Sequence, residues 1–226
     1  MAPPLRARSS SPSSRHMTGS RPAIIGPILL LDNLSDGCMH LAALFITDRH
    51  VAPPPMTVPT GMAAATCIAT FDDAAVWRVR FALPADRASS YLWNGTTYAV
   101  ASDMTGDLRA AFVSCNGEEV GDLDRDGLER NVMWARMRDD HGRQPLSLLL
   151  HGGDQIYADE ITKGHRLSAG WPKDLPRNPS AEALADLRHH LRQRLFDRYA
   201  QIYTARPFAW LAARVPSLMQ WDDHDI

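Results

Sequence analysis

The sequence predicts an α/β domain with a parallel or mixed sheet and covering helices, preceded by a small domain that resembles a β-sandwich. Two observations lead to this fold class. Residues 23–105 contain short apolar segments separated by turn residues, which is typical of an all-β domain. Residues 106–226 alternate short apolar segments with longer helical patterns, which indicates a parallel sheet. We therefore expect a domain boundary between residues 105 and 106.

The N-terminal segment is expected to lie outside both domains. Residues 1–22 are rich in Ser, Pro and Arg, a composition that predicts disorder. The apolar run 23–31 is similar to a signal peptide, but it is short, contains Gly26 and Pro27, and is not followed by a clear cleavage site. The sequence contains no apolar run that approaches the ~20 residues needed to cross a bilayer. We expect a cytoplasmic protein that does not bind membranes.

The expected strands of the β-rich domain are short, and turns separate them. Asn94-Gly95 lies between two segments that favour strands, which is a strong signal for a two-residue hairpin turn. Polar and apolar side chains alternate from Val76 to Phe81, as they do in a strand with one buried face. The expected strands are residues 23–31, 40–47, 63–70, 76–83, 90–94 and 96–102.

The second domain is expected to contain strands and helices in alternation. On its longest helix, leucines recur at helical spacing from Leu184 to Leu195, and Ser180 is a suitable N-cap. We interpret the many basic side chains of this helix as a solvated face rather than a phosphate-binding patch. The expected elements are strand 109–115, a helix at about 126–140, strand 146–151, a helix at about 181–204 and strand 215–220.

The amino-acid composition is typical of an ordinary globular protein. Hydrophobic residues make up 45% of the chain and charged residues 22%, and the formal net charge is −2. Because the basic excess of a nucleic-acid-binding protein is missing, we expect small-molecule partners and no nucleic acid. The widely spaced Cys38, Cys67 and Cys115 form no CxxC pair, so they indicate neither a disulfide framework nor a zinc ribbon.

Side chains that can bind metal follow the second strand of this domain. Gly152-Gly153 allows the chain to bend sharply after the strand. Asp154 is thereby presented at the carboxyl end of the strand, where open α/β sheets place their sites. Tyr157 follows three residues later. A carboxylate and a phenolate at this spacing can reach one ion, and a hard trivalent metal such as iron(III) suits both oxygens.

Two further polar clusters follow the other strands. Ser114-Cys115-Asn116 ends the first strand, and Trp-Asp-Asp-His-Asp at 221–225 follows the third. Taken alone, a cysteine after a strand is commonly a small buried hydrophobe, and Asp222 and Asp223 commonly form a turn or a helix cap. Because a parallel sheet brings the carboxyl ends of its strands to one edge, the clusters together predict a dinuclear metal site.

These motifs resemble those of the PhoD-like (alkaline phosphatase D) metallophosphatases of the calcineurin-like phosphoesterase superfamily. The resemblance is carried by FVSCN at 112–116, LLLHGGDQIYADE at 148–160 and WDDHDI at 221–226. The GDxxY pattern is shared with the purple acid phosphatases, and the last motif is similar to the GNH[DE] loop of the superfamily. In that alignment Asp223 takes the asparagine position and His224 the histidine position. The resemblance implies a metallophosphatase domain preceded by a β-rich domain.

The resemblance also implies roles for individual residues. Cys115 and Tyr157 would bind iron(III), Asp154 would bridge two metals, and Asp223 would bind the second metal, calcium. His224 would be the catalytic residue that contacts the phosphate or the leaving group. The implied activity is hydrolysis of a small-molecule phosphate ester, as a phosphodiesterase or phosphomonoesterase with Fe(3+) and Ca(2+) as cofactors, or with another divalent metal in place of one of them. Asp159 and Asp225 match positions that are often acidic in the family, and we assign them no ligand role.

The resemblance is limited to the N-terminal portion of the family domain. Members of the superfamily take further histidine ligands from motifs downstream of the loop that carries His224, and this sequence contains none. We therefore expect an incomplete metallophosphatase domain, the N-terminal part of a longer protein, which alone binds metal weakly and shows little turnover. The alternative is a non-catalytic binding or structural module that retains part of a phosphatase site.

Other enzyme classes find less support in the sequence. His151-Gly152-Gly153 is similar to the oxyanion loop of α/β-hydrolase esterases, but the GxSxG pattern that this class requires does not occur. The HExxH, GxxxxGK[ST] and GxGxxG patterns are absent too. Their absence argues against zincin, P-loop and Rossmann chemistry.

Overall fold

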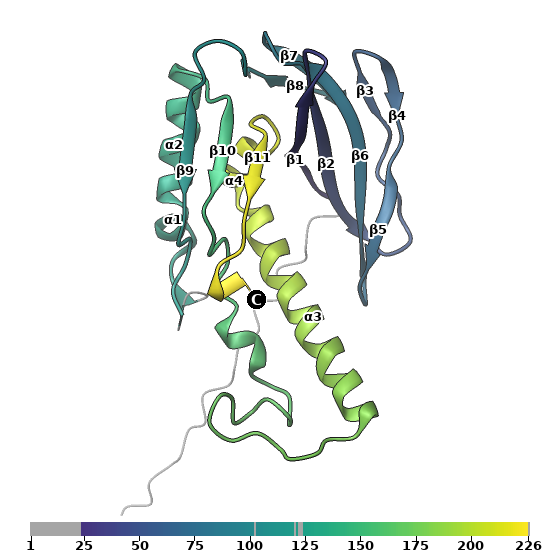
Figure 1. Cartoon of the computed structure of the whole chain (residues 1–226), viewed down its shortest axis with the longest axis vertical. Helices are drawn as coiled ribbons and strands as arrows, with labels where there is room; N and C mark the ends of the chain where they lie inside the picture. The colour runs from purple at the N-terminus through teal and green to yellow at the C-terminus, as the bar shows by residue number, and fades with distance from the viewer. Residues whose placement is uncertain (1–23, 102, 120, 122–123, 226) are drawn as a thin grey trace, which may run out of the picture.

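A mixed sheet of seven strands forms the centre of the computed structural model, which describes residues 24–101, 103–119, 121 and 124–225 (Figure 1). The predicted disordered segment, residues 1–22, lies outside the described residues. The strand order is β5-β6-β2-β1-β11-β10-β9. The strands are β1 (Ile24–Ser35), β2 (Cys38–Asp48), β5 (Thr66–Thr70), β6 (Ala74–Pro84), β9 (Ala110–Val113), β10 (Leu148–His151) and β11 (Ser217–Met219).

The sheet combines a parallel and an antiparallel half. Strands β9, β10, β11 and β1 are parallel, and β1, β2, β6 and β5 are antiparallel. This mixed sheet agrees with the predicted α/β class. Leu30 of β1 pairs with Ser217 of β11, so one sheet crosses residue 105, near which we expected a domain boundary.

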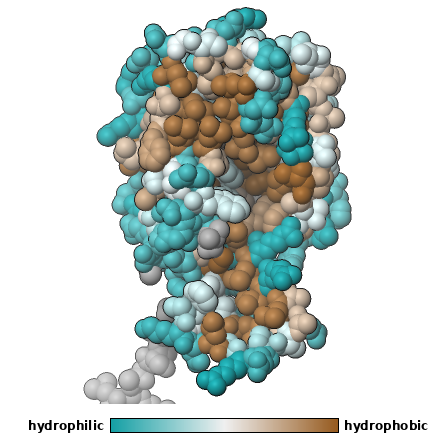
Figure 2. Space-filling view, in the orientation of Figure 1, coloured by the Kyte–Doolittle hydropathy of each residue, from teal (hydrophilic) through white to brown (hydrophobic). Residues whose placement is uncertain are grey.

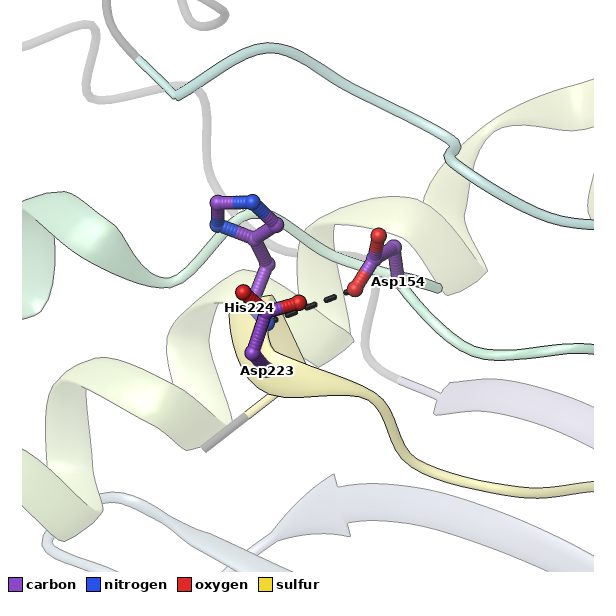
Figure 3. A group of neighbouring side chains, drawn as sticks. All are labelled: Asp154, Asp223 and His224. Carbon is purple, nitrogen blue, oxygen red and sulfur yellow. Dashed lines mark hydrogen bonds between the residues drawn. The ribbon is translucent and has the colours of Figure 1, made fainter.

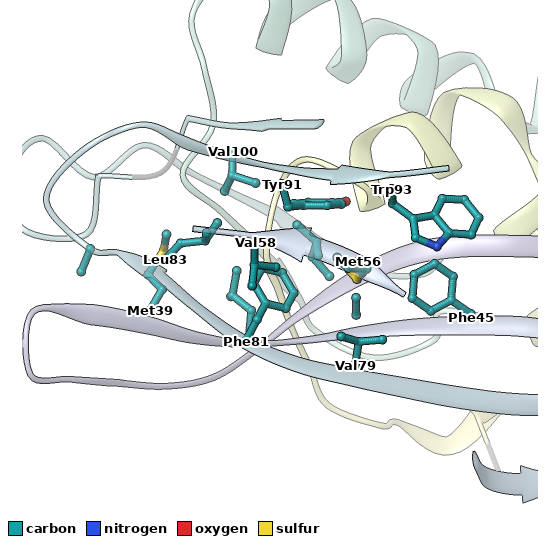
Figure 4. Close-up of a cluster of buried hydrophobic side chains, with 14 residues drawn as sticks. Met39, Phe45, Met56, Val58, Val79, Phe81, Leu83, Tyr91, Trp93 and Val100 are labelled. Carbon is teal, nitrogen blue, oxygen red and sulfur yellow. The ribbon is translucent and has the colours of Figure 1, made fainter. Parts of the chain in front are cut away.

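A second sheet packs against the N-terminal strands. Its order is β4-β3-β7-β8, and its strands are β3 (Met56–Val58), β4 (Gly61–Ala63), β7 (Ser89–Trp93) and β8 (Thr96–Val100). Between the two sheets lies the largest apolar cluster of the described residues, which includes the fully buried Met39, Phe45 and Met56 (Figure 4). Each such side chain stabilises the fold by roughly 2 kcal/mol relative to an exposed position.

The predicted hairpin turn is confirmed. Asn94 and Gly95 both have positive φ, 46° and 74°, as a two-residue type I′ turn between β7 and β8 requires. The strand predicted at residues 63–70 is instead divided, because β4 ends at Ala63 and β5 begins at Thr66. Strand β3 was not predicted, since three prolines directly precede it.

Helices cover one face of the parallel half. They are α1 (Gly127–Arg130), α2 (Val132–Arg143), α3 (Ala181–Thr204) and α4 (Arg206–Ala212). Short 3₁₀ helices lie after β10, at η2 (Asp159–Thr162), and after β11, at η3 (Asp223–Asp225). Helix α3 has the predicted bounds, and the hydroxyl of Ser180 accepts a hydrogen bond from the Ala183 N–H at 3.1 Å. Helix α4 was not predicted, because a proline so soon after α3 indicates the end of helical structure. In the structure, Pro207 instead occupies the first turn of a new helix, where proline is favoured.

Helices bury one face of the parallel strands, whereas apolar side chains on the other face are exposed. Trp134, Phe208 and Leu211 from α2 and α4 pack on Leu149. On the opposite face, the neighbouring Phe112 and Leu218 are 70% and 42% exposed. Apolar side chains gather over the central strands in the view of Figure 2. Within the described ranges, the helices are all too short or too polar to span a membrane.

Candidate metal centre

The loops after β9, β10 and β11 meet at one edge of the sheet. The registers place β10 between β9 and β11, so the carboxyl ends of the three strands lie side by side. Backbone hydrogen bonds then join the loops: the Asn116 N–H donates to the Asp154 carbonyl at 2.8 Å, and the Ala158 N–H donates to the His224 carbonyl at 2.9 Å. The sequence motifs therefore converge as the parallel sheet predicts.

The backbone at this edge adopts left-handed conformations. Cys115 and Asp154 have φ values of 57° and 54°, and Gly153 has a φ of 104°. A Cβ atom on Gly153 would lie 2.5 Å from the Cβ of Asp222, so only glycine allows this close approach of the loops after β10 and β11. Positive φ at non-glycine residues is strained, and such strain is concentrated at functional sites.

The side chain of Asp225 connects the loops after β10 and β11 through hydrogen bonds. Its side chain is buried and accepts hydrogen bonds from the backbone N–H groups of Asp154, Ile156 and Asp222 at 2.7, 3.2 and 3.1 Å. The Tyr199 hydroxyl on α3 donates a further hydrogen bond at 3.1 Å. A buried carboxylate with this many donors is well compensated for the loss of water. It fixes the loop after β10 relative to the loop after β11.

Asp154 lies at the centre of the candidate site. Potential ligand atoms of Asp154, Asp223 and His224 all lie within 4.8 Å of one another (Figure 3). The Oδ1 atom of Asp154 accepts a hydrogen bond from the His224 N–H at 3.3 Å, and its Oδ2 atom lies 3.6 Å from the Sγ atom of Cys115. The two oxygens of one carboxylate therefore face two different groups of candidate ligands.

The ring of Tyr157 packs against His224 and against the loop after β9. Its ring stacks on the imidazole of His224, with ring centroids 4.4 Å apart and planes inclined by 23°. A Cβ on Gly117 would lie 2.6 Å from a ring carbon of Tyr157, so the loop after β9 also approaches this ring closely. Burial, together with the nearby Cys115 and Asp154, raises the pKa of Tyr157 to about 12. Without a cation beside it, the phenol therefore stays protonated at neutral pH.

The His224 ring is oriented by carboxylates. Its Nδ1 atom lies 2.9 Å from Asp159 Oδ2, and its Nε2 atom lies 3.8 Å from Glu119 Oε1. Because a carboxylate can only accept, Nδ1 carries a proton toward Asp159. Burial lowers the pKa of His224, but the hydrogen bond to Asp159 and the charges of Asp159, Asp223 and Asp154 outweigh burial and raise it overall.

All of the residues proposed from the sequence as ligands or catalytic group thus lie together. Cys115, Asp154 and Tyr157 form one group, and Asp223 and His224 adjoin it from the third loop. Their thiol, phenol, carboxyl and imidazole groups form a donor set that suits a pair of metal ions with mixed preferences.

The positioning roles of Asp159 and Asp225 were not found from the sequence. The only available signal was that both are acidic residues inside the motifs, which does not distinguish a residue that binds metal from one that binds backbone. A third supporting residue is Asn116, whose side chain accepts a hydrogen bond from the Trp134 indole at 2.9 Å and donates one to the Gln155 carbonyl at 3.2 Å. These contacts connect the site to α2.

Comparison with known proteins identifies one family. A family model described as PhoD-like phosphatase matches residues 110–226. The match begins at the first residue of β9 and includes all three loops of the candidate metal centre. No curated protein and no solved structure gives a significant match to the chain.

Proposed function

The chain belongs to the PhoD-like phosphatase family, and from this premise we propose that it hydrolyses small-molecule phosphate esters at a dinuclear metal centre. The observation that carries the proposal is the position of Asp154. One oxygen of its carboxylate faces Cys115 at 3.6 Å, and the other faces the loop of Asp223 and His224. A carboxylate in this position can bridge two ions, one on each side.

The proposed ligands divide into two groups with different preferences. Cys115 and Tyr157 would lose their protons on binding an ion and supply a thiolate and a phenolate, whose negative charge suits iron(III). The exposed carboxylate of Asp223 would supply a hard oxygen, which suits calcium as the second ion. Bound ions would supply Lewis acidity that neutralises charge on the phosphoryl oxygens.

His224 is the proposed catalytic residue. Asp159 holds its Nδ1–H, and stacking on Tyr157 fixes the plane of the ring. The Nε2 atom remains to contact an oxygen of the phosphate or of the leaving group. Asp159 is therefore a positioning residue, which sets the tautomer and the direction of the imidazole.

Metal loading and one substitution test the proposal. The purified protein is stripped with a chelator, reloaded with iron and calcium, and assayed for metal content and for hydrolysis of bis(p-nitrophenyl) phosphate. Because the set of ligands in this sequence is incomplete, we expect reloading to restore slow hydrolysis and Asp154→Asn to abolish it, whereas Asp139→Asn, an exposed carboxylate on α2, leaves the slow rate unchanged. Unaltered turnover by the Asp154→Asn variant would refute the bridging role. A protein that binds no metal and hydrolyses no ester would instead support a non-catalytic binding module.

A further inference from the structure

A cavity of about 500 Å³ opens beside the candidate metal centre, between α2, α3 and the loop after β9. One wall consists of Ser114, Cys115 and Asn116, so the cavity and the proposed iron side share a residue. Its volume lies within the range of roughly 300–1,000 Å³ that is typical of small-molecule pockets. The cavity is therefore large enough for an organic group of moderate size next to the proposed metals.

The floor of this cavity is apolar. It is lined by Trp134, which belongs to the apolar cluster around Leu149 and Phe208, and by side chains that pack against this cluster: Val113, Met137, Ile202 and Ala205. At the rim, the side chains of Val132 and Met133 are mostly exposed. An organic group that entered the cavity would remove these apolar surfaces from water, which favours binding.

The charged residues of the lining favour an anion. They are three arginines, Arg125, Arg130 and Arg198, and one glutamate, Glu129. Arg125 forms ion pairs with Glu129 at 3.4 Å and with Glu118 at 3.3 Å. The Nε atom of Arg198 donates to the Tyr157 carbonyl at 3.2 Å, which places this guanidinium group beside a proposed metal ligand.

We infer that the cavity binds the organic group of the substrate, and that this group is apolar. The phosphate group lies toward Cys115 and Arg198, and the positive charge of Arg130 attracts it. The organic group lies on the floor formed by Trp134 and Met137. The orientation of the phosphate rests on the proposed function. The substrate class is thus an aryl or alkyl phosphate ester rather than the ester of a polar alcohol such as a sugar.

Binding to the metal-free protein tests this inference without turnover. In the presence of a chelator, calorimetric titration compares 1-naphthyl phosphate with inorganic phosphate and with 1-naphthol. We expect 1-naphthyl phosphate to bind at least about tenfold more tightly than either, because only it fills the apolar floor and also carries the charge. Equal binding of 1-naphthyl phosphate and inorganic phosphate would overturn the inference, since the ring would then contribute nothing.

Two variants and one control locate the binding site. Met133→Trp places a large ring at the mouth of the cavity, and because Met133 is 60% exposed the protein retains its fold. We expect this variant, and separately Arg130→Gln, to weaken 1-naphthyl phosphate binding by at least about fivefold. Arg138 lies on α2, as Met133 does, but it is ion-paired with Asp139 outside the cavity, so Arg138→Gln should bind as the unaltered protein does. Binding of full strength by the Met133→Trp variant would overturn the inference.

The binding test is separable from the test of catalysis. Asp154→Asn removes the proposed bridging ligand, but Asp154 is not part of the cavity lining. Loss of hydrolysis in this variant, with unchanged naphthyl phosphate binding to the metal-free protein, supports both proposals. If the reloaded protein hydrolyses esters but the cavity variants bind normally, the proposed function stands and the cavity assignment fails.

Discussion

At the scale of single residues, the site combines strained backbone with reactive side chains. Among the described residues, the non-glycine positions with positive φ are Asp36, Asn94, Cys115, Asp154 and Asn178. Aspartate and asparagine tolerate this conformation because their short polar side chains bond locally. Cys115 is the exception, and it is also the proposed thiolate ligand. The backbone therefore places the thiol toward Asp154 at the expense of stability.

Substitution of Cys115 should reveal this strain. Cys115→Gly and Cys115→Ala both remove the thiol, so both should lose iron binding. Only glycine relaxes the left-handed backbone, and we expect Cys115→Gly to be more stable than Cys115→Ala by roughly 1 kcal/mol. Urea unfolding of the metal-free variants measures the difference. Equal stability of the two variants would show that this residue is not strained.

His151 at the end of β10 should make the fold sensitive to acid. Burial lowers the pKa of His151 from 6.5 to about 4, although the charge of Asp225 acts in the opposite direction. The unfolded chain therefore takes up a proton between about pH 6.5 and pH 4 that the folded protein does not. The free energy of unfolding therefore decreases as the pH falls through this window, and His151 accounts for up to about 3 kcal/mol of the decrease. Above about pH 6.5, His151 is neutral in both states and its titration does not change stability.

The comparison of His151→Gln with the unaltered protein isolates this contribution. Glutamine cannot titrate, and it can still form a hydrogen bond with Ser217, whose Oγ lies 3.3 Å from His151 Nε2. We expect urea unfolding at pH 7.5 and pH 5 to show a smaller acid loss in the variant. Parallel losses in both proteins would assign acid sensitivity to other groups.

At the scale of the elements, most helices and strands could be predicted because their patterns are local. Leucine spacing and the Ser180 cap determine α3, and Asn94-Gly95 determines the hairpin β7–β8. The convergence of the motifs after β9, β10 and β11 could also be predicted, because the carboxyl ends of parallel strands lie at the same edge of a sheet. The buried hydrogen bonds of Asp225 could not be predicted, because they join backbone groups from separate loops whose spacing is set by tertiary packing.

The Asp225 carboxylate should matter more to stability than its neighbours in the same motif. Asparagine at this position has one acceptor oxygen in place of two, and its NH₂ group would face backbone donors. We expect Asp225→Asn to reduce the free energy of unfolding of the metal-free protein by roughly 2–4 kcal/mol. The exposed Asp223→Asn serves as the matched control and should have a much smaller effect in the same urea titration. Equal losses would contradict the role of Asp225 in joining the loops.

At the scale of the whole molecule, the N-terminal strands and the candidate metal centre share one structure. Strand β1 pairs with β2 on one side and with β11 on the other. The ring of Phe71, before β6, stacks on Phe196 of α3 with centroids 3.9 Å apart, and the Tyr91 hydroxyl donates to the Ala213 carbonyl at 2.6 Å. This arrangement could not be predicted, because the partner strands are distant in the sequence and no local pattern encodes their pairing.

These contacts should make residues 24–105 and 106–225 unfold together. We expect hydrogen exchange in low denaturant, read by mass spectrometry, to show one global opening free energy for peptides from β1, β2, β10 and α3. A lower opening free energy confined to the peptides of β1 and β2 would instead support a separate N-terminal domain.

The position of β9 at the outer edge of the sheet has a consequence for how long the candidate metal centre keeps its structure. Among the described strands, β9 pairs with β10 alone, it is four residues long, and its Phe112 is largely exposed. Short outer strands fray first, and an apolar outer strand also recruits other chains into aggregates. The loop that carries Cys115 follows directly from this strand. Storage or mild heating should therefore disorder this loop and weaken the proposed metal binding while circular dichroism still reports an intact fold. The four residues of β9, rather than the large core, would then limit the lifetime of the metal centre.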